Sequence, residues 1–307
     1  MIDLHTHSNC SDGDLNPEML ILEAEKRGLR AVALTDHDTI SGLDAANAAV
    51  KQHNLRERIH FIPGIEINID WTAGKYPRGV PGMGPGGEFH LLGLGINSPS
   101  KGFLAAVDEL FRRREARNRE ILNRMHEYSI DVSWEDLLEA AGSSDRNKNQ
   151  SIGRPHFASL LIKRKIVKNA KQAFARYLGV GKPFYAPKQG LIFEEAVFLI
   201  RESGGIPVLA HPTSLYVAWG RLGDLIKALK DMGLMGLEAW HPAAKPGSCR
   251  RLEALAKSLG LFVTEGSDFH GGIRPDHQLG YSSKGRKISD AVLEAIPPLL
   301  PLSAPLL

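Results

Sequence analysis

Short apolar runs alternate with longer amphipathic stretches over most of the chain. The runs expected to form strands are residues 2–6, 30–35, 60–69, 88–96, 206–210, 236–240 and 261–265. The stretches typical of helices are residues 17–28, 41–50, 193–203, 222–232, 249–259 and 291–299, with Ser41 as the expected cap of the second. An order of strand, helix and strand predicts parallel pairing, and therefore an α/β fold.

Residues 98–190 depart from this alternation. They contain a long amphipathic stretch at 103–128 and shorter helical stretches at 134–141, 155–163 and 170–178, with no strand of note. We therefore expect a barrel domain formed by residues 1–97 and 191–307, with residues 98–190 as a helical insertion. Residues 75–87 are rich in Gly and Pro, which indicates a loop between two strands.

The composition is that of a globular protein. Of the 307 residues, 43% are hydrophobic and 24% are charged, and the formal net charge is +3. This charge does not single out a nucleic-acid-binding protein, but it is compatible with anionic substrates. Two cysteines imply no disulfide framework and favour a reducing compartment. Without a signal peptide or a membrane-spanning run, we expect a cytoplasmic protein that does not enter a membrane.

The first candidate chemistry lies at the start of the chain, in His5-Thr6-His7. Side chains two residues apart on a strand point the same way, so His5 and His7 project together from one strand end. Asp12 follows on a turn marked by Gly13. Two imidazoles and a carboxylate suit a divalent cation such as Zn, Mn or Fe.

Other strand ends carry similar side chains. They are Asp36, His37 and Asp38, then His211, His241, Asp268 and His270, while Glu66 and His90 lie within strands. The carboxyl ends of parallel barrel strands converge on one mouth, where active sites are built. Histidines that served only core packing would be scattered along the chain, so this pattern predicts a functional site.

These motifs resemble those of the PHP family, named for polymerase and histidinol phosphatase. The matching residues are His5-Thr6-His7 with Asp12, Thr35-Asp36-His37, Gly64-Ile65-Glu66, Phe89-His90, Ala210-His211-Pro212 and Gly266-Ser267-Asp268-Phe269-His270. Within the family, Gly153-Arg154-Pro155-His156 and Gly181-Lys182-Pro183-Phe184-Tyr185 resemble a bacterial branch acting on nucleotide phosphates. That branch includes nucleoside 3′,5′-bisphosphate phosphatases and 5′-to-3′ exonucleases on short RNA.

The resemblance implies a distorted seven-stranded β/α barrel that holds two to three divalent metal ions (Mn, Fe or Zn). Carried over by motif, the first ion takes His5, His7, Glu66 and Asp268, the second Glu66, His90 and His211, and the third Asp12, His37 and His270. Glu66 would bridge the first two ions. Three carboxylates against three divalent cations leave a positive centre that suits a phosphate, which a metal-held hydroxide attacks.

The remaining candidates each have a structural alternative. Arg154 and His156 are expected to act on and bind the substrate phosphate, or else to mark a helix start at Pro155. Lys182 and Tyr185 are further candidates for substrate contacts. His241 is the candidate general acid, or else a buried histidine beside Trp240.

Several other side chains are given non-catalytic interpretations. Asp36 and Asp38 either orient His37 or cap the next helix. The run of Arg112, Arg113 and Arg114 is interpreted as a solvated helix face, with a role in holding RNA as its alternative. The histidines expected at the surface are His53, His60, His126 and His277.

The sequence therefore predicts a metal-dependent phosphoesterase for a small nucleotide or a short 5′-phosphorylated RNA, with no obligate protein partner. One alternative is a phosphatase of a non-nucleotide metabolite such as histidinol phosphate. Another is a metal-binding module without turnover.

Overall fold

Seven strands form one nearly closed sheet in the computed structural model, which describes residues 1–70, 87–142 and 150–300. The strands follow one another in chain order: β1 (Ile2–Asp3), β2 (Ala31–Leu34), β3 (His60–Asn68), β4 (His90–Leu94), β5 (Ile206–Leu209), β6 (Gly236–Trp240) and β7 (Phe262–Glu265). A parallel bridge between Thr6 and Phe269 joins the segments that follow β1 and β7. The sheet thus curls into the expected seven-stranded barrel.

Strand β4 runs against the direction of its neighbours, and no direction was predicted for it from the sequence. It runs antiparallel to both β3 and β5, with His90 opposite Asn68. A parallel connection between neighbouring strands needs a crossover, usually a helix, and no helix is described between β3 and β4. Because β4 is reversed, its first residue, His90, lies at the mouth where the other strands end.

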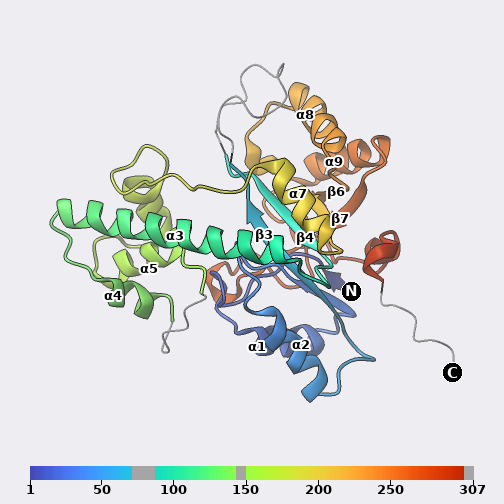
Figure 1. Cartoon of the computed structure of the whole chain (residues 1–307), viewed down its shortest axis with the longest axis horizontal. Helices are drawn as coiled ribbons and strands as arrows, with labels where there is room; N and C mark the ends of the chain where they lie inside the picture. The colour runs from blue at the N-terminus through green and yellow to red at the C-terminus, as the bar shows by residue number, and fades with distance from the viewer. Residues whose placement is uncertain (71–86, 143–149, 301–307) are drawn as a thin grey trace.

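Helices cover the outside of the barrel (Figure 1). They are α1 (Pro17–Lys26), α2 (Leu43–Gln52), α7 (Phe193–Glu202), α8 (Trp219–Asp231), α9 (Pro246–Ser258) and α10 (Ala291–Glu294). Helix α1 begins as its sequence indicates, because Asn16 accepts a hydrogen bond from the Met19 N–H and Pro17 occupies the first turn. The prediction for Ser41 is wrong, since α2 is capped by Gly42 without a side-chain bond.

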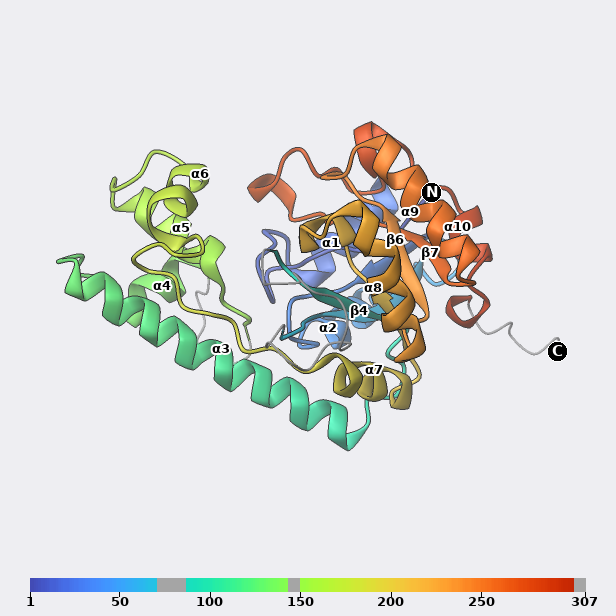
Figure 2. The same cartoon turned by 90° about the horizontal axis from the view of Figure 1, so that it is seen from above.

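The insertion forms a second lobe beside the barrel (Figure 2). It contains α3 (Lys101–Glu127), α4 (Trp134–Ala140), α5 (Arg154–Lys163), α6 (Ala170–Ala173) and a π-helical turn, η1 (Phe174–Leu178). Helix α3 joins the lobes, because Phe103, Val107 and Leu110 pack in the barrel core whereas Ile121 and Met125 pack in a separate core with the insertion. The domain boundaries at residues 97 and 191 remain a sequence-based prediction.

The structure bears only in part on the predicted loop and on the expectation that the chain does not enter a membrane. The predicted loop at residues 75–87 lies, apart from Gly87, outside the described residues. Within the described part of the chain, no helix is long and apolar enough to cross a membrane.

Candidate metal centre

The nine predicted ligands meet at one mouth of the barrel. His5 and His7 follow β1, His37 follows β2, Asp268 and His270 follow β7, and Glu66 lies near the end of β3. His5, His7 and Glu66 are fully buried, and His37 is the most accessible of the nine. The fold therefore brings together side chains that are as far apart in sequence as His5 and His270.

The first predicted set has the spacing of a tetrahedral cation site. His5 Nε2 and His7 Nε2 are 3.1 Å apart. Asp268 Oδ1 lies 3.6 and 3.2 Å from them, and Glu66 Oε2 lies 3.5 and 3.4 Å from them. Four ligands bound at ~2.0–2.1 Å around one ion stand about 3.3 Å apart. Glu66 Oε2 is buried without a hydrogen bond and lies 2.8 Å from Nδ1 of His37, another candidate ligand, so these residues fit a metal ion.

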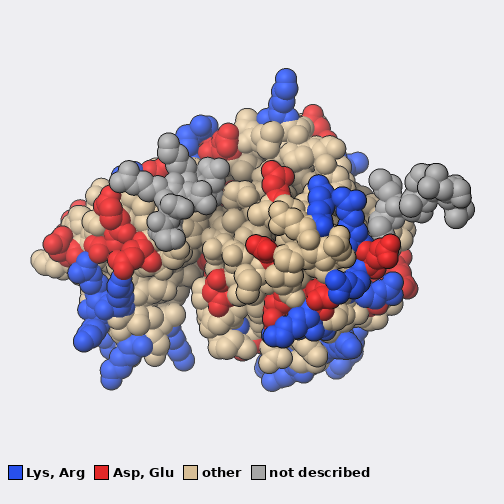
Figure 3. Space-filling view, turned by 90° about the horizontal axis from the view of Figure 1, so that it is seen from below, with Lys and Arg blue, Asp and Glu red and all other residues tan. Residues whose placement is uncertain are grey.

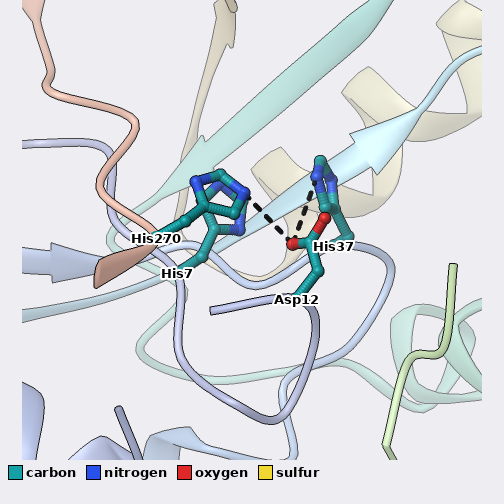
Figure 4. A group of neighbouring side chains, drawn as sticks. All are labelled: His7, Asp12, His37 and His270. Atoms are coloured by element: carbon teal, nitrogen blue, oxygen red, sulfur yellow. Dashed lines mark ion pairs between the residues drawn. The ribbon is translucent and has the colours of Figure 1, made fainter. Parts of the chain in front are cut away.

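The predicted third set lies on the other side of His7. Figure 4 shows His7, Asp12, His37 and His270 facing one another. Asp12 Oδ1 lies 3.2 Å from His270 Nε2 and 3.7 Å from His37 Nε2. Asp12 Oδ1 and His270 Nε2 are buried without hydrogen-bond partners, which a bound cation would supply. The structure adds His7 to the three residues expected here.

The second predicted set converges on the other oxygen of Glu66. Glu66 Oε1 lies 2.9 Å from His90 Nδ1 and 2.8 Å from His211 Nε2. Two groups of donor atoms are each close enough to share one ion. The first contains His5, Glu66 and His211, and the second contains His37, Glu66 and His90. Glu66 thus offers one oxygen to each side, as a bridging ligand requires.

Burial and neighbouring charges shift the pKa values of several groups in the cluster. Burial, together with His270 and His37, lowers the pKa of His7 to about 3, and burial lowers that of His90 to about 4. Both imidazoles are therefore neutral near pH 7, with lone pairs available. Burial raises the pKa of Glu66, but His37, His90 and His5 outweigh it and hold that pKa well below its usual value.

A pocket of about 670 Å³ opens above this cluster, between the barrel mouth and the insertion. From the barrel it is lined by Asp12, His37, Glu66, His90, His211, His241 and Asp268. The insertion and its flanks add Arg114, Gly153, Arg154, Phe174 and Lys188. A ligand held here would touch metal-binding groups on one side and cationic side chains on the other.

Comparison with known proteins decides the family. A sequence model of the PHP domain matches residues 3–182, more than half of the chain. The chain belongs to the PHP family. Its resemblance in sequence motifs, its barrel and its clustered ligands agree with this assignment.

Curated relatives in the family match most of this PHP chain. It is 31% identical over 268 residues to a 5′-3′ exoribonuclease of Salmonella typhimurium, covering 87% of this chain and 84% of that one. It is 30% identical over 269 residues to a 3′,5′-nucleoside bisphosphate phosphatase of Chromobacterium violaceum, covering 88% and 87%.

Solved structures agree with this assignment. A Bifidobacterium adolescentis protein described as a candidate metal-dependent phosphoesterase matches with a TM-score of 0.80 at 26% identity, over 98% of this chain and 97% of that one. A C. violaceum protein named an amidohydrolase, solved with sulfate and without metal, matches with a TM-score of 0.78 at 28% identity, over 96% of each. The protein is a metal-dependent phosphoesterase of the PHP family.

Glu238 contacts two of the candidate metal ligands and was not recognised in the sequence. This residue of β6 is buried, accepts a hydrogen bond from His5 Nδ1 at 2.9 Å, and accepts the His211 N–H at 2.6 Å. The contact fixes the proton of His5 on Nδ1 and leaves Nε2 free for a cation. A charged residue inside the apolar strand Gly236–Trp240 was the signal available in the sequence.

Glu238→Gln is expected to lower metal affinity about 10- to 100-fold, because the amide cannot accept both hydrogen bonds. Titration of the metal-free protein with Mn²⁺ or Zn²⁺ measures this change. Glu57→Gln, on the barrel surface, is the matched control. Equal affinities in the two variants would show that Glu238 does not position the ligands.

Asp36 and Asp38 hold loops rather than His37 or α2. Asp36 accepts hydrogen bonds from the Ser8 N–H and from the hydroxyls of Ser8 and Ser11, and so fixes the turn that carries Asp12. Burial raises the pKa of Asp36 to about 6. Asp38 accepts the Asn68 N–H at 2.8 Å and pairs with Arg114. Within the described residues neither bonds His37 or caps α2, so both predicted roles are wrong.

Asp268 is enclosed by three side chains besides its predicted metal partners. Arg274 donates to Asp268 Oδ2 at 2.8 Å, and His241 Nε2 lies 3.3 Å from the same oxygen. His277 was expected at the surface, but it is buried, lies 3.0 Å from the Asp268 carbonyl through Nδ1, and lines the pocket. That prediction is wrong, because the loop after β7 folds back over the mouth.

The other three histidines assigned to the surface are not part of the cluster. His53 and His126 are exposed and His60 is half-buried. His53 pairs with Glu18, and His60 Nε2 lies 2.8 Å from the Leu299 carbonyl. The surface prediction is confirmed for His53 and His126.

The candidates in the insertion divide into two groups. Arg154 lines the pocket, where it donates to Glu88 Oε1 at 2.8 Å and to the Leu178 carbonyl at 3.3 Å. His156 is buried at the start of α5, where its Nδ1 accepts the Gly153 N–H at 3.0 Å. Tyr185 lies behind Arg154, whose guanidinium is 5.8 Å from the ring. Lys182 is exposed, and neither it nor Tyr185 is part of the pocket wall.

Lys188 is a pocket cation that was not recognised in the sequence. Its Nζ lies 3.3 Å from His90 Nε2 and 3.7 Å from Glu88 Oε1. Burial lowers the pKa of Lys188, although Glu88 opposes this effect. The segment after Tyr185 is irregular, so no periodicity in the sequence indicates which of its side chains face the pocket.

Proposed function

We propose that the protein hydrolyses phosphate esters of small nucleotides, with nucleoside 3′,5′-bisphosphates and short 5′-phosphorylated RNAs as substrates. The observation that carries the proposal is the shared pocket, in which the metal-binding cluster faces Arg154 and Lys188. The names of the relatives from S. typhimurium and C. violaceum support the same substrate class.

A single phosphate would leave part of the positive charge of the pocket without an anionic partner. Asp12, Glu66 and Asp268 supply three carboxylates, whereas two or three divalent ions supply a larger positive charge. One phosphate can be held by the cluster. Arg154 and Lys188 share the single carboxylate of Glu88 and so keep a net positive charge for a second phosphate, which a guanidinium binds through paired N–H donors.

The side chains of the cluster would hold the metal ions in the sets described above. When bound, such ions activate water at neutral pH and stabilise the charge that develops on phosphorus. Glu238 keeps Nε2 of His5 free, and Asp36 holds the turn of Asp12.

His241 is the proposed general acid for the leaving oxygen. His241 lines the pocket, and its Nε2 lies 3.3 Å from Asp268 Oδ2.

His156 and Tyr185 act through Arg154 in this proposal. His156 closes the first turn of α5, where Arg154 stands, and the Tyr185 and Phe174 rings lie 5.8 and 5.6 Å from the guanidinium carbon. A side chain that is already oriented loses less conformational entropy when it binds a phosphate. Lys182 reaches substrate only outside the pocket.

Substrate preference tests the proposal. We expect a nucleoside 3′,5′-bisphosphate to be cleaved with a higher kcat/KM than p-nitrophenyl phosphate, because only the bisphosphate engages both the cluster and the cations. The advantage should shrink at high salt, and in Arg154→Gln/Lys188→Gln, since partly exposed charge contacts are screened by salt and removed by the substitutions. Equal kcat/KM values for the two substrates in the parent enzyme would contradict the nucleotide assignment.

A further inference from the structure

The C-terminal half of the insertion has an unusual charge distribution. Between Asp145 and Glu194 the sequence contains eleven Lys and Arg residues and no Asp or Glu. The whole chain carries only +3, so the remainder of the protein is net negative. Seven of the described cations are exposed, and two of them, Lys163 and Arg164, pair with Glu139 and Asp136. The other five define the basic lobe surface: Lys165, Lys168, Lys171, Arg176 and Lys182.

The cations of this surface differ from those of α3. On α3, the exposed Arg112 and Arg119 pair with Glu109 and Glu115 at 3.0 and 2.7 Å. The five side chains of the basic lobe surface have no acidic partner within 4.0 Å among residues 1–70, 87–142 and 150–300. Their mutual repulsion is uncompensated, which is typical of a surface that binds a polyanion.

The basic lobe surface continues from the pocket. Phe174 lines the pocket at the start of η1, and the exposed Lys171 and Arg176 lie three residues before it and two residues after it. Arg154, on the same wall, bonds the Leu178 carbonyl at the end of η1. Figure 3 shows Lys and Arg side chains gathered on the lower part of the smaller lobe, beside the notch that separates it from the barrel.

Two aromatic side chains line the pocket. Phe174 lies on one wall, and Tyr216, on another, is 78% exposed. Such an exposed ring is available to stack on a base, and stacking beside a basic groove is how proteins hold single strands without reading sequence. A pocket of about 670 Å³ suits one drug-sized ligand, so a longer strand must continue outside it.

We propose that the basic lobe surface binds the sugar–phosphate backbone of single-stranded RNA on the 3′ side of the nucleotide held at the metal centre. This inference rests on the proposed function and deepens it, because it favours RNA of several nucleotides over a single nucleotide. Each Lys or Arg that contacts a phosphate releases counterions, which makes the binding depend on salt.

The test uses fluorescence anisotropy with a 3′-labelled, 5′-phosphorylated octaribonucleotide. Its linkages are phosphorothioates, which keep the charge and resist cleavage. The test variant is Lys165→Gln/Lys168→Gln/Lys171→Gln/Arg176→Gln. The matched control removes the same charge from the exposed barrel surface: Lys26→Gln/Lys51→Gln/Arg56→Gln/Lys230→Gln.

We expect the test variant to bind the octamer at least tenfold more weakly than the parent at 0.1 M salt, and the control to stay within twofold. The slope of log Kd against log salt should fall by about 0.7 for each phosphate that the variant no longer neutralises. Turnover of a nucleoside 3′,5′-bisphosphate should stay within twofold of the parent, because that substrate ends inside the pocket.

Three outcomes would overturn the inference: octamer binding at the parental affinity, an equal weakening in the control, or a parallel drop in bisphosphate turnover. Binding of the parent, but not the test variant, to phosphatidylserine vesicles with unchanged RNA affinity would assign the surface to a membrane instead. A parent that binds the octamer through this surface yet cleaves none of the phosphate esters would contradict the proposed function alone.

Discussion

Glu66→Gln is expected to lose at least one metal equivalent and to lower kcat roughly a thousandfold or more. Glu66 offers Oε2 to the His5 and His7 side and Oε1 to the His90 and His211 side, so both sets depend on one carboxylate. A neutral amide keeps the shape but removes the charge, and charge stabilisation by a metal is worth several kcal/mol. Elemental analysis and steady-state kinetics measure the two effects.

His53→Ala is the matched control for this experiment, because His53 is exposed and pairs only with Glu18 among the described residues. It should keep the metal content and turnover of the parent. Full metal content with near-normal turnover in Glu66→Gln would exclude Glu66 as a bridging ligand.

Arg154→Ala is expected to lower kcat/KM for a nucleoside 3′,5′-bisphosphate about ten- to a hundredfold while the metal content stays unchanged. A charge-assisted hydrogen bond is worth about 1.5–3 kcal/mol, and its removal appears in kcat/KM. Arg154 bonds the barrel residue Glu88 at 2.8 Å without a bound substrate, so a phosphate would replace or extend that contact. Kinetics on the bisphosphate and on p-nitrophenyl phosphate measure the change.

Arg164→Ala is the control for Arg154. Arg164 lies on the same lobe but pairs with Asp136 at the surface. It should behave as the parent on both substrates. If Arg154→Ala also kept the parental kinetics on the bisphosphate, Arg154 would serve only to join the lobe to Glu88.

The clustering of the candidate metal ligands follows in large part from features of the sequence. His5 and His7 share a strand end, and Asp268 and His270 follow another, so two simple rules of strand geometry place four of the donors. Strand ends also placed His37 and His211, and the family motifs supplied the roles of Asp12, Glu66 and His90. His7 contacts two groups of donors rather than one, and this sharing depends on distances that a sequence does not contain.

The direction of β4 was left open by the sequence pattern. The apolar residues at 88–96 predict a strand but not its direction. Elsewhere in the chain, the alternation of strands and helices favoured parallel pairing. The absence of a helical pattern between the expected strands 60–69 and 88–96 was the available signal, since an antiparallel pair needs no crossover. Because β4 is reversed, its first residue, His90, lies at the same mouth as the other candidate ligands.

The residues that contact the candidate ligands from behind or from the side could not be predicted in the same way. Glu238 supports His5 and His211 from a strand that contributes no predicted ligand, and Lys188 reaches His90 from an irregular segment. His277 joins Asp268 through the fold of a loop. Each contact depends on tertiary packing between distant parts of the chain, which local periodicity does not encode.

Removal and restoration of metal test the central claim most directly. The protein as purified should contain two to three equivalents of divalent metal and hydrolyse a nucleoside 3′,5′-bisphosphate. Chelation should abolish that activity without unfolding the barrel, and a divalent ion such as Mn²⁺ should restore it in proportion to the equivalents bound. A chelated, metal-free protein that still hydrolyses the bisphosphate at the parental rate would contradict the claim that the clustered histidines and carboxylates form a catalytic metal centre.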